Sequence, residues 1–211
     1  LGSFAELAID LGGWHVDRAL RAVAACWSQG SLHGPYVNPK TQEPPLPADH
    51  AIHRERDNWN WTAYGEIAVE DVILGCQTML IRDDDSDWLD IAIPTGMLHL
   101  VGDISYPFEP ANHAWWSKLE SVFVNVADHI ATAVPFELGL IGEEVSGMYF
   151  ADPTHPDTLP REYVERYGGV LLGPQTWDSL RPAVPAVSLS SGLRLVPTTK
   201  ELHYGPTAAS D

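Results

Sequence analysis

Hydrophobic and polar residues alternate along a central stretch of the chain, residues 58–93. From Trp59 to Val69 every second residue is apolar or glycine, and most residues between them are polar. Strand side chains point alternately to two faces, so this spacing predicts a strand with one buried face. Apolar runs over 72–82 and 88–93 follow after short polar turns. Because short polar connections favour antiparallel hairpins, the stretch predicts a three-stranded antiparallel meander.

Two other segments have helical spacing. Apolar residues recur every three or four positions over about 16–29 and 113–134, which predicts two amphipathic helices. Further strands are expected near 136–141, 170–172 and 187–196. The predicted fold class is therefore α+β, an antiparallel sheet of about five to seven strands with both main helices packed mainly on one face.

The remaining segments are less regular. Residues 1–11 are mildly apolar and are compatible with a short helix or an edge strand. Prolines are dense over 31–49 and prevent regular structure, so we expect a surface loop there. Residues 205–211 are expected to form a frayed tail. We expect residues 1–211 to form a single domain, because the segment before the proline-rich loop is too small to fold alone.

The charge balance narrows the classes of partner. The chain has 29 acidic and 12 basic residues, which gives a net charge of -17. This balance disfavours binding to a nucleic-acid backbone or to an anionic membrane surface, both of which need clustered Lys and Arg. It is compatible with a basic protein partner, a cationic ligand or simple solubility. No apolar run reaches the roughly 18 residues of a membrane span.

The cysteines and the first residues of the chain indicate the cellular compartment in which the protein is expected. Cys26 and Cys76 each lie in an apolar pattern, so we expect buried free thiols and a reducing, cytoplasmic compartment. Residues 1–10 contain no basic segment, so no intact signal peptide is expected. The chain does not begin with methionine, which is compatible with removal of an earlier segment.

The densest acidic cluster lies at the end of the second predicted strand. Within eight positions the chain places Asp83, Asp84, Asp85, Asp87 and Asp90. The first, third and fifth positions copy the ligand spacing of a calcium loop, but Trp88 and Pro94 replace the required glycine and glutamate. The alternatives are a binding site for cations or a basic partner, and a solvated hairpin turn. Asp90 differs because it lies inside a strand, where it must face water or have a specific partner.

A second candidate cluster combines histidines with carboxylates. On a helix, one face would carry Asp49, His50, His53 and Asp57. These residue types ligate zinc and other divalent ions, although the spacing matches no zinc-protease motif. The alternative is an ordinary charged surface.

Glu143 and Glu144 follow the strand expected at 136–141. Active-site residues often lie at strand ends, so these residues are candidates for an acid/base pair, with a solvated turn as the alternative. The sequence contains no phosphate-binding glycine loop, no CxxC motif and no catalytic-triad spacing.

Two functional hypotheses follow. The first is a non-enzymatic acidic binding protein that holds a basic protein partner, as an immunity protein or antitoxin does, and needs no cofactor. The second is a metal-assisted or acid/base hydrolase-like enzyme that uses the Asp83–Asp87 turn or His50 and His53, with Glu143 or Glu144 as base. The charge balance and the lack of a catalytic motif favour the first.

Overall fold

The computed structural model describes residues 3–38, 40, 43, 60–82, 86–105, 110–146, 161–199 and 202–203. Its strands are β1 (Phe4–Asp10), β2 (Leu32–Tyr36), β3 (Asn60–Val69), β4 (Val72–Arg82), β5 (Asp87–Pro94), β6 (Leu138–Glu143), β7 (Val170–Leu172), β8 (Val187–Ser188), β9 (Arg194–Val196) and β10 (Leu202–His203). Its helices are α1 (Val16–Ser28), α3 (Trp116–Ala133), α4 (Arg161–Tyr167), α5 (Pro174–Leu180) and the 3-10 helix η1 (Thr95–Leu100).

All of these strands belong to one sheet. Neighbouring strands follow the order β2-β3-β4-β5-β1-β6-β7-β9-β8, and every neighbouring pair along this path is antiparallel. β10 lies beside the end of β6 in parallel orientation. The predicted α+β class is confirmed, and the meander expected over 58–93 corresponds to β3, β4 and β5. The expected number of strands, about five to seven, is too low, because the sheet has ten strands among the described residues.

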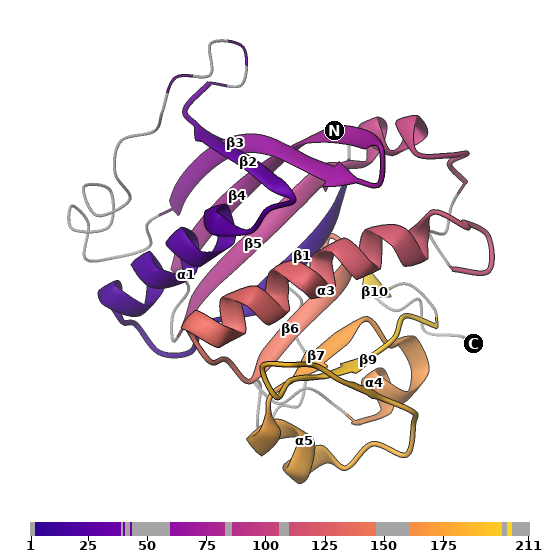
Figure 1. Ribbon diagram of the computed structural model, residues 1–211. Coiled ribbons are helices and arrows are strands. Elements are labelled where there is room, and N and C mark those ends of the chain that lie inside the picture. The colour runs from indigo at the N-terminus through magenta and orange to yellow at the C-terminus, as the bar shows by residue number, and fades with distance from the viewer. Residues whose placement is uncertain are drawn as a thin grey trace, which may run out of the picture.

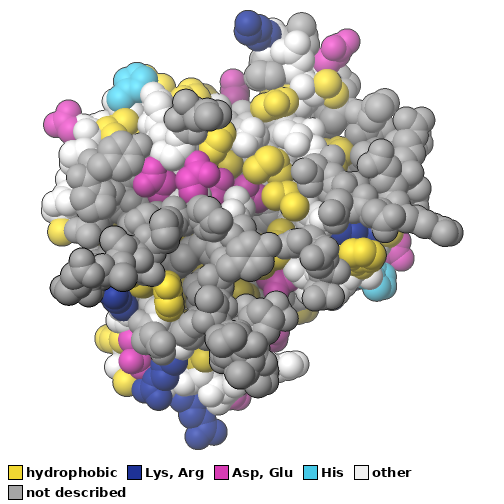
Figure 2. Space-filling view, turned by 180° about the vertical axis from the view of Figure 1, so that it is seen from behind, with side chains coloured by type: hydrophobic (Ala, Val, Ile, Leu, Met, Phe, Trp, Pro, Cys, Tyr) yellow, Lys and Arg dark blue, Asp and Glu magenta, His cyan; other side chains and the backbone are white. Residues whose placement is uncertain are grey.

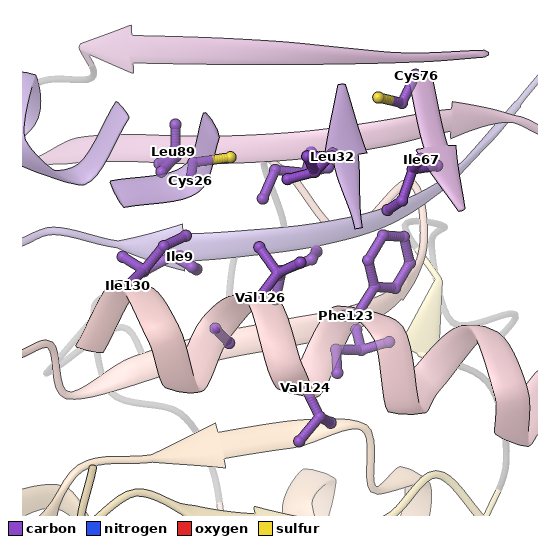
Figure 3. Close-up of a cluster of buried hydrophobic side chains, with 14 of the residues drawn as sticks. Ile9, Cys26, Leu32, Ile67, Cys76, Leu89, Phe123, Val124, Val126 and Ile130 are labelled. Atoms are coloured by element: carbon purple, nitrogen blue, oxygen red, sulfur yellow. The ribbon is translucent and has the colours of Figure 1, made fainter. Parts of the chain in front are cut away.

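The two long helices cover one face of the sheet, as the sequence predicts. α1 and α3 lie side by side across that face (Figure 1). Phe123, Val126 and Ile130 point from α3 toward the strands, where they join Ile9 of β1 in the main core (Figure 3). Burial of apolar side chains of this size stabilises a fold by roughly 1.5–3 kcal/mol each, so this helix–sheet interface contributes strongly to stability.

The sequence-based interpretation of residues 1–11 is wrong. β1 is neither a helix nor an edge strand, because it pairs with β5 on one side and β6 on the other. Leu7 and Ile9 face the helices and are fully buried. Strands that are far apart in sequence bury β1 on both sides, and a local pattern cannot reveal such pairing.

The proline-rich segment 31–49 also contains a strand that we did not expect. β2 includes Pro35 and lies at one end of the sheet. An edge strand tolerates proline because its outward N–H needs no partner. The predicted helix boundaries differ from the structure by a few residues, since α1 ends at Ser28 and α3 begins at Trp116.

A second, smaller apolar cluster lies on the opposite face of the sheet, near β6 and β7. It includes Ala8, Leu140 and Val170 of the sheet and Val164 of α4. None of the helices in the described ranges is long and apolar enough to cross a membrane. The predicted frayed tail, 205–211, lies outside the described residues.

One glycine of β3 makes a testable close contact. A methyl group on Gly65 would overlap the Trp27 ring of α1 and the backbone carbonyl of His33. Gly65→Ala is therefore expected to lower the free energy of unfolding by about 1–3 kcal/mol through overpacking. Urea denaturation measures the change. Gly30→Ala is the matched control, because nothing lies within 4 Å of its added methyl group, and equal stability of the two variants would contradict the assignment.

Candidate functional site

Glu6 and Asp90 lie on the face of the sheet that α1 and α3 do not cover, here called the back face. In β1 and β5 the residues on either side of them, including Leu7 and Ile91, point into the helix-side core. Ala92 pairs with Glu6 and Ala8 pairs with Asp90 in the register of the two strands. Glu6 and Asp90 are therefore diagonal neighbours, a relationship that places Cα atoms about 7–8 Å apart.

Both carboxyl groups are buried, but they differ in their partners. Glu6 is 2% exposed and Asp90 is 0% exposed. Oε2 of Glu6 accepts hydrogen bonds from the backbone N–H and the hydroxyl of Ser146, each at 3.0 Å. Neither carboxylate oxygen of Asp90 makes a hydrogen bond of ordinary length and angle with a described residue, although the Ile91 N–H and the Ser146 hydroxyl lie near enough to act on its charge. A buried polar group without a partner costs free energy, so Asp90 is the exceptional group of this site.

Glu144 brings a third carboxyl group to the site. Its Oε1 accepts a hydrogen bond from the Phe4 backbone N–H at 2.8 Å, and its own N–H donates to the Phe4 carbonyl at 3.1 Å. Its φ of 51° lies in the left-handed region, which non-glycine residues rarely adopt. The tight turn after β6 thus fixes Glu144 and Ser146 beside the start of β1.

The electrostatics of the site favour protonation. Burial raises the pKa of the Glu6 carboxyl from 4.5 to about 7, against the opposing hydrogen bonds from Ser146, and the Glu144 charge adds to the rise. Burial also raises the pKa of Asp90 well above its ordinary range, with further contributions from the charges of Glu6 and Glu144 and against weaker hydrogen bonding from the Ile91 N–H and the Ser146 hydroxyl. The ion pairs found among the described residues lie elsewhere, at Arg82–Asp87, Lys118–Glu70 and Arg161–Glu165. These carboxyl groups therefore need a proton or an added cation.

The Asp87 carboxylate, three residues before Asp90, has hydrogen-bond partners within the protein. It is fully buried, and its two oxygens accept from Nε and Nη2 of Arg82 at 2.7 and 3.0 Å. The backbone N–H of His15 also donates to Oδ2 of Asp87, at 3.1 Å. Arg82 in turn lies over the Trp14 ring, 4.8 Å from its centroid. This arrangement ties the β4–β5 hairpin to the start of α1.

The structure brings only some of the predicted site residues together. Asp90 and Glu144 join the site, whereas Glu143 pairs with Ala5 and so lies on the helix side of the sheet. Outside the described residues lie Asp83, Asp84, Asp85, Asp49, His50, His53 and Asp57, and their roles stay predictions. No group of three or more His, Cys, Asp or Glu residues in the described ranges is arranged to hold a metal ion.

Sequence reasoning missed Glu6. The available signal was an acidic residue between Ala5 and Leu7 in an apolar segment, the same signal that marked Asp90. The back face seen in Figure 2 has acidic side chains gathered near its middle, next to hydrophobic side chains and to residues that are not described. The site therefore belongs to a face that carries acidic groups at its surface.

Comparison with known proteins gives little further guidance. No protein-family model matches the chain, and a search of curated proteins finds no match. The fold is similar to a solved structure described as Pseudomonas aeruginosa T6SS protein PA0821, with a TM-score of 0.40 and 10% identity over 98% of this chain and 72% of that chain. Since a likeness this weak supports no argument about function, the functional proposal depends on the chemistry of the site.

Proposed function

We propose that this protein is a non-enzymatic acidic binding protein that holds a basic protein partner against the back face of its sheet, as an immunity protein or antitoxin would. The observation that carries this proposal is the Asp90 carboxyl group. It is fully buried, makes no hydrogen bond of ordinary geometry with a described residue, and lies with Glu6 and Glu144. Buried carboxylates are normally paired, so a group in this state is a candidate binding residue.

Other acidic residues contrast with Asp90 because they hold loops of the protein itself. Glu120 accepts from the Thr198 N–H at 2.7 Å, and Glu137 accepts from the Thr176 N–H at 3.0 Å. Asp128 accepts from the Ser191 N–H at 2.9 Å. Their charges are already used within the fold, which leaves the back-face group as the better candidate for an external partner.

The overall charge supports the same class of partner. A net charge of -17 attracts basic proteins over distances of about a Debye length and speeds their association. Charge complementarity of this kind sets specificity and association rate, and it weakens as salt is added. The proposal therefore predicts a salt-sensitive complex.

A pull-down from the native lysate at low and high salt tests the proposal. We expect one stoichiometric basic protein, identified by mass spectrometry, that is released at high salt. The double variant Glu6→Gln/Asp90→Asn is expected to weaken capture at low salt by about thirtyfold or more, because truncating a buried charge pair at an interface costs roughly 2–5 kcal/mol.

Asp178→Asn is the matched control, since Asp178 is exposed on α5 and its change removes one charge from the surface. Capture by this variant should equal that of the wild type. Absence of a basic partner at low salt would overturn the proposed function. Equal capture by the double variant would exclude the back-face carboxyl groups as its basis.

An acid/base enzyme is the second candidate, and one observation favours it. Burial raises the pKa of Glu6 to about 7, near the value at which a carboxyl group serves as a general acid or base at neutral pH. An enzyme would lose turnover in Glu6→Gln while still binding its substrate. A binding protein would lose affinity in the same variant, which separates the two candidates.

A further inference from the structure

We infer that Glu6 and Asp90 form the receptor site for one cationic side chain of the partner, a lysine or arginine head group. This inference rests on the proposed function. It assigns that function a specific binding site and a specific exchange of a proton for a cation. The ligand that this site would bind is a primary ammonium or guanidinium group on a flexible alkyl chain.

The first support is the register of the sheet. Glu6 pairs with Ala92 on β5 and with Gly142 on β6. Asp90 pairs with Ala8 on β1 and with Met79 on β4. Three of these four neighbours carry at most a methyl group, so the two carboxyl groups stand among small residues on this face. Because Glu6 and Asp90 are 2% and 0% exposed, an incoming cationic side chain reaches them only when this face of the sheet opens.

The second support is the pattern of free and occupied acceptors. Oε2 of Glu6 is held by two hydrogen bonds from Ser146, and Oε1 of Glu144 is held by the Phe4 N–H. Neither oxygen of Asp90 makes a hydrogen bond of ordinary geometry with a described residue, and the Ile91 N–H and the Ser146 hydroxyl act on it only as weaker donors. A site whose carboxylates are already oriented loses less conformational freedom on binding. The free acceptors match the several N–H donors of an ammonium or guanidinium group.

The third support is the sign of the charges around Asp90. The charged groups of the described residues that act on it are Glu6 on β1 and Glu144 after β6, and both are acidic. An anionic ligand would be repelled by these charges, and only a cation supplies the counter-charge that the ionised carboxyl groups need in a buried site. The half-buried Glu144 offers the first contact for a cation that approaches from solvent.

The exchange has a defined proton balance. A cation with one positive charge enters, and one carboxyl O–H of the pair gives its proton to solvent. Binding therefore competes with protonation and strengthens as pH rises. With the pKa of Glu6 at about 7, release of one proton predicts affinity about tenfold higher at pH 8 than at pH 6.

The test uses n-butylguanidinium and n-butylammonium as probes of the full chain. The side-chain ¹³C carboxyl signals of Glu6 and Asp90 are followed by NMR at pH 6 and pH 8. We expect both signals to shift on titration, with about tenfold tighter binding at pH 8. Asp90→Asn should abolish the shift at Glu6, Asp178→Asn should leave it unchanged, and neutral n-butylurea should produce none.

Each outcome has a distinct meaning. Unshifted carboxyl signals, or equal affinity at both pH values, would overturn the inference in the wild-type protein, even if a variant fails to fold. Shifts produced by calcium chloride but not by n-butylguanidinium would overturn it in favour of a metal ion. If a basic partner is captured but the probes do not bind, this inference fails and the proposed function stands. If the probes bind but no basic partner is found, the cation site stands and the proposed function fails.

Discussion

Replacement of Arg82 by alanine is expected to lower the free energy of unfolding by roughly 3–5 kcal/mol, because it leaves Asp87 buried without its counter-charge. The pair is buried on both sides, with side-chain exposures of 8% for Arg82 and 1% for Asp87. The substitution also removes the contact of the guanidinium group with the Trp14 ring. Urea denaturation at neutral pH measures the loss.

Lys118→Ala is the control for Arg82→Ala. Lys118 pairs with Glu70 at 2.7 Å, but the two side chains are 48% and 59% exposed. Exposed pairs contribute only about 0–1 kcal/mol, so this variant should be nearly as stable as the wild type. Similar losses in the two variants would contradict the assignment of Arg82–Asp87 as a buried anchor.

The anchor matters for the candidate site because of where it lies. The Asp87 carbonyl accepts from the Leu11 N–H at 2.8 Å, and the Asp87 N–H donates to the Gly12 carbonyl at 3.1 Å. These bonds join the end of β1 to the start of β5, the two strands that carry Glu6 and Asp90. Loss of the ion pair should therefore also weaken the alignment of the two carboxyl groups.

The stability of the wild-type protein is expected to fall as pH rises from about 4.5 to about 7. The unfolded chain releases the Glu6 proton near pH 4.5, whereas the folded protein keeps it until about pH 7. The folded state therefore binds more protons across this window, so a rise in pH favours unfolding. A shift from 4.5 to about 7 corresponds to about 3 kcal/mol, and the raised pKa of Asp90 acts in the same direction.

The double variant Glu6→Gln/Asp90→Asn tests this origin of the pH dependence. Neutral amides cannot titrate, so the fall in stability over this window should largely vanish and the variant should exceed the wild type at pH 8. Urea denaturation at several pH values provides the comparison, and Asp178→Asn should keep the wild-type profile. A wild-type protein that becomes more stable from pH 5 to pH 7 would contradict the buried acidic pair.

Most of the fold follows from local patterns. The alternation from Trp59 to Val69 and the apolar stripe of α3 are periodic over many residues, so β3 and α3 are readable without knowledge of their neighbours. The position of β1 in the sheet cannot be read from a local pattern, because its strand partners begin at Asp87 and Leu138. Pairing over such separations depends on the assembled sheet rather than on the seven residues of β1.

The candidate site, even more than β1, depends on contacts that local sequence patterns do not reveal. Asp87 and Asp90 lie three positions apart in one strand, yet Arg82 neutralises the first and no described residue neutralises the second. The contact of Glu6 with Ser146 joins residues 140 positions apart. Sequence reasoning could mark Asp90 as an acid inside a strand, but only the sheet register reveals Glu6 as its neighbour.

A ¹³C NMR titration of the Glu6 and Asp90 carboxyl groups in the free protein tests the central claim most directly. We expect Glu6 to titrate with a pKa of about 7 and the pKa of Asp90 to lie well above its ordinary range. Such values would show a buried acidic pair without an internal counter-charge, ready to accept a cation. Titration of both groups near the ordinary carboxyl values of about 4 would mean that they are already solvated or neutralised, and would contradict the account.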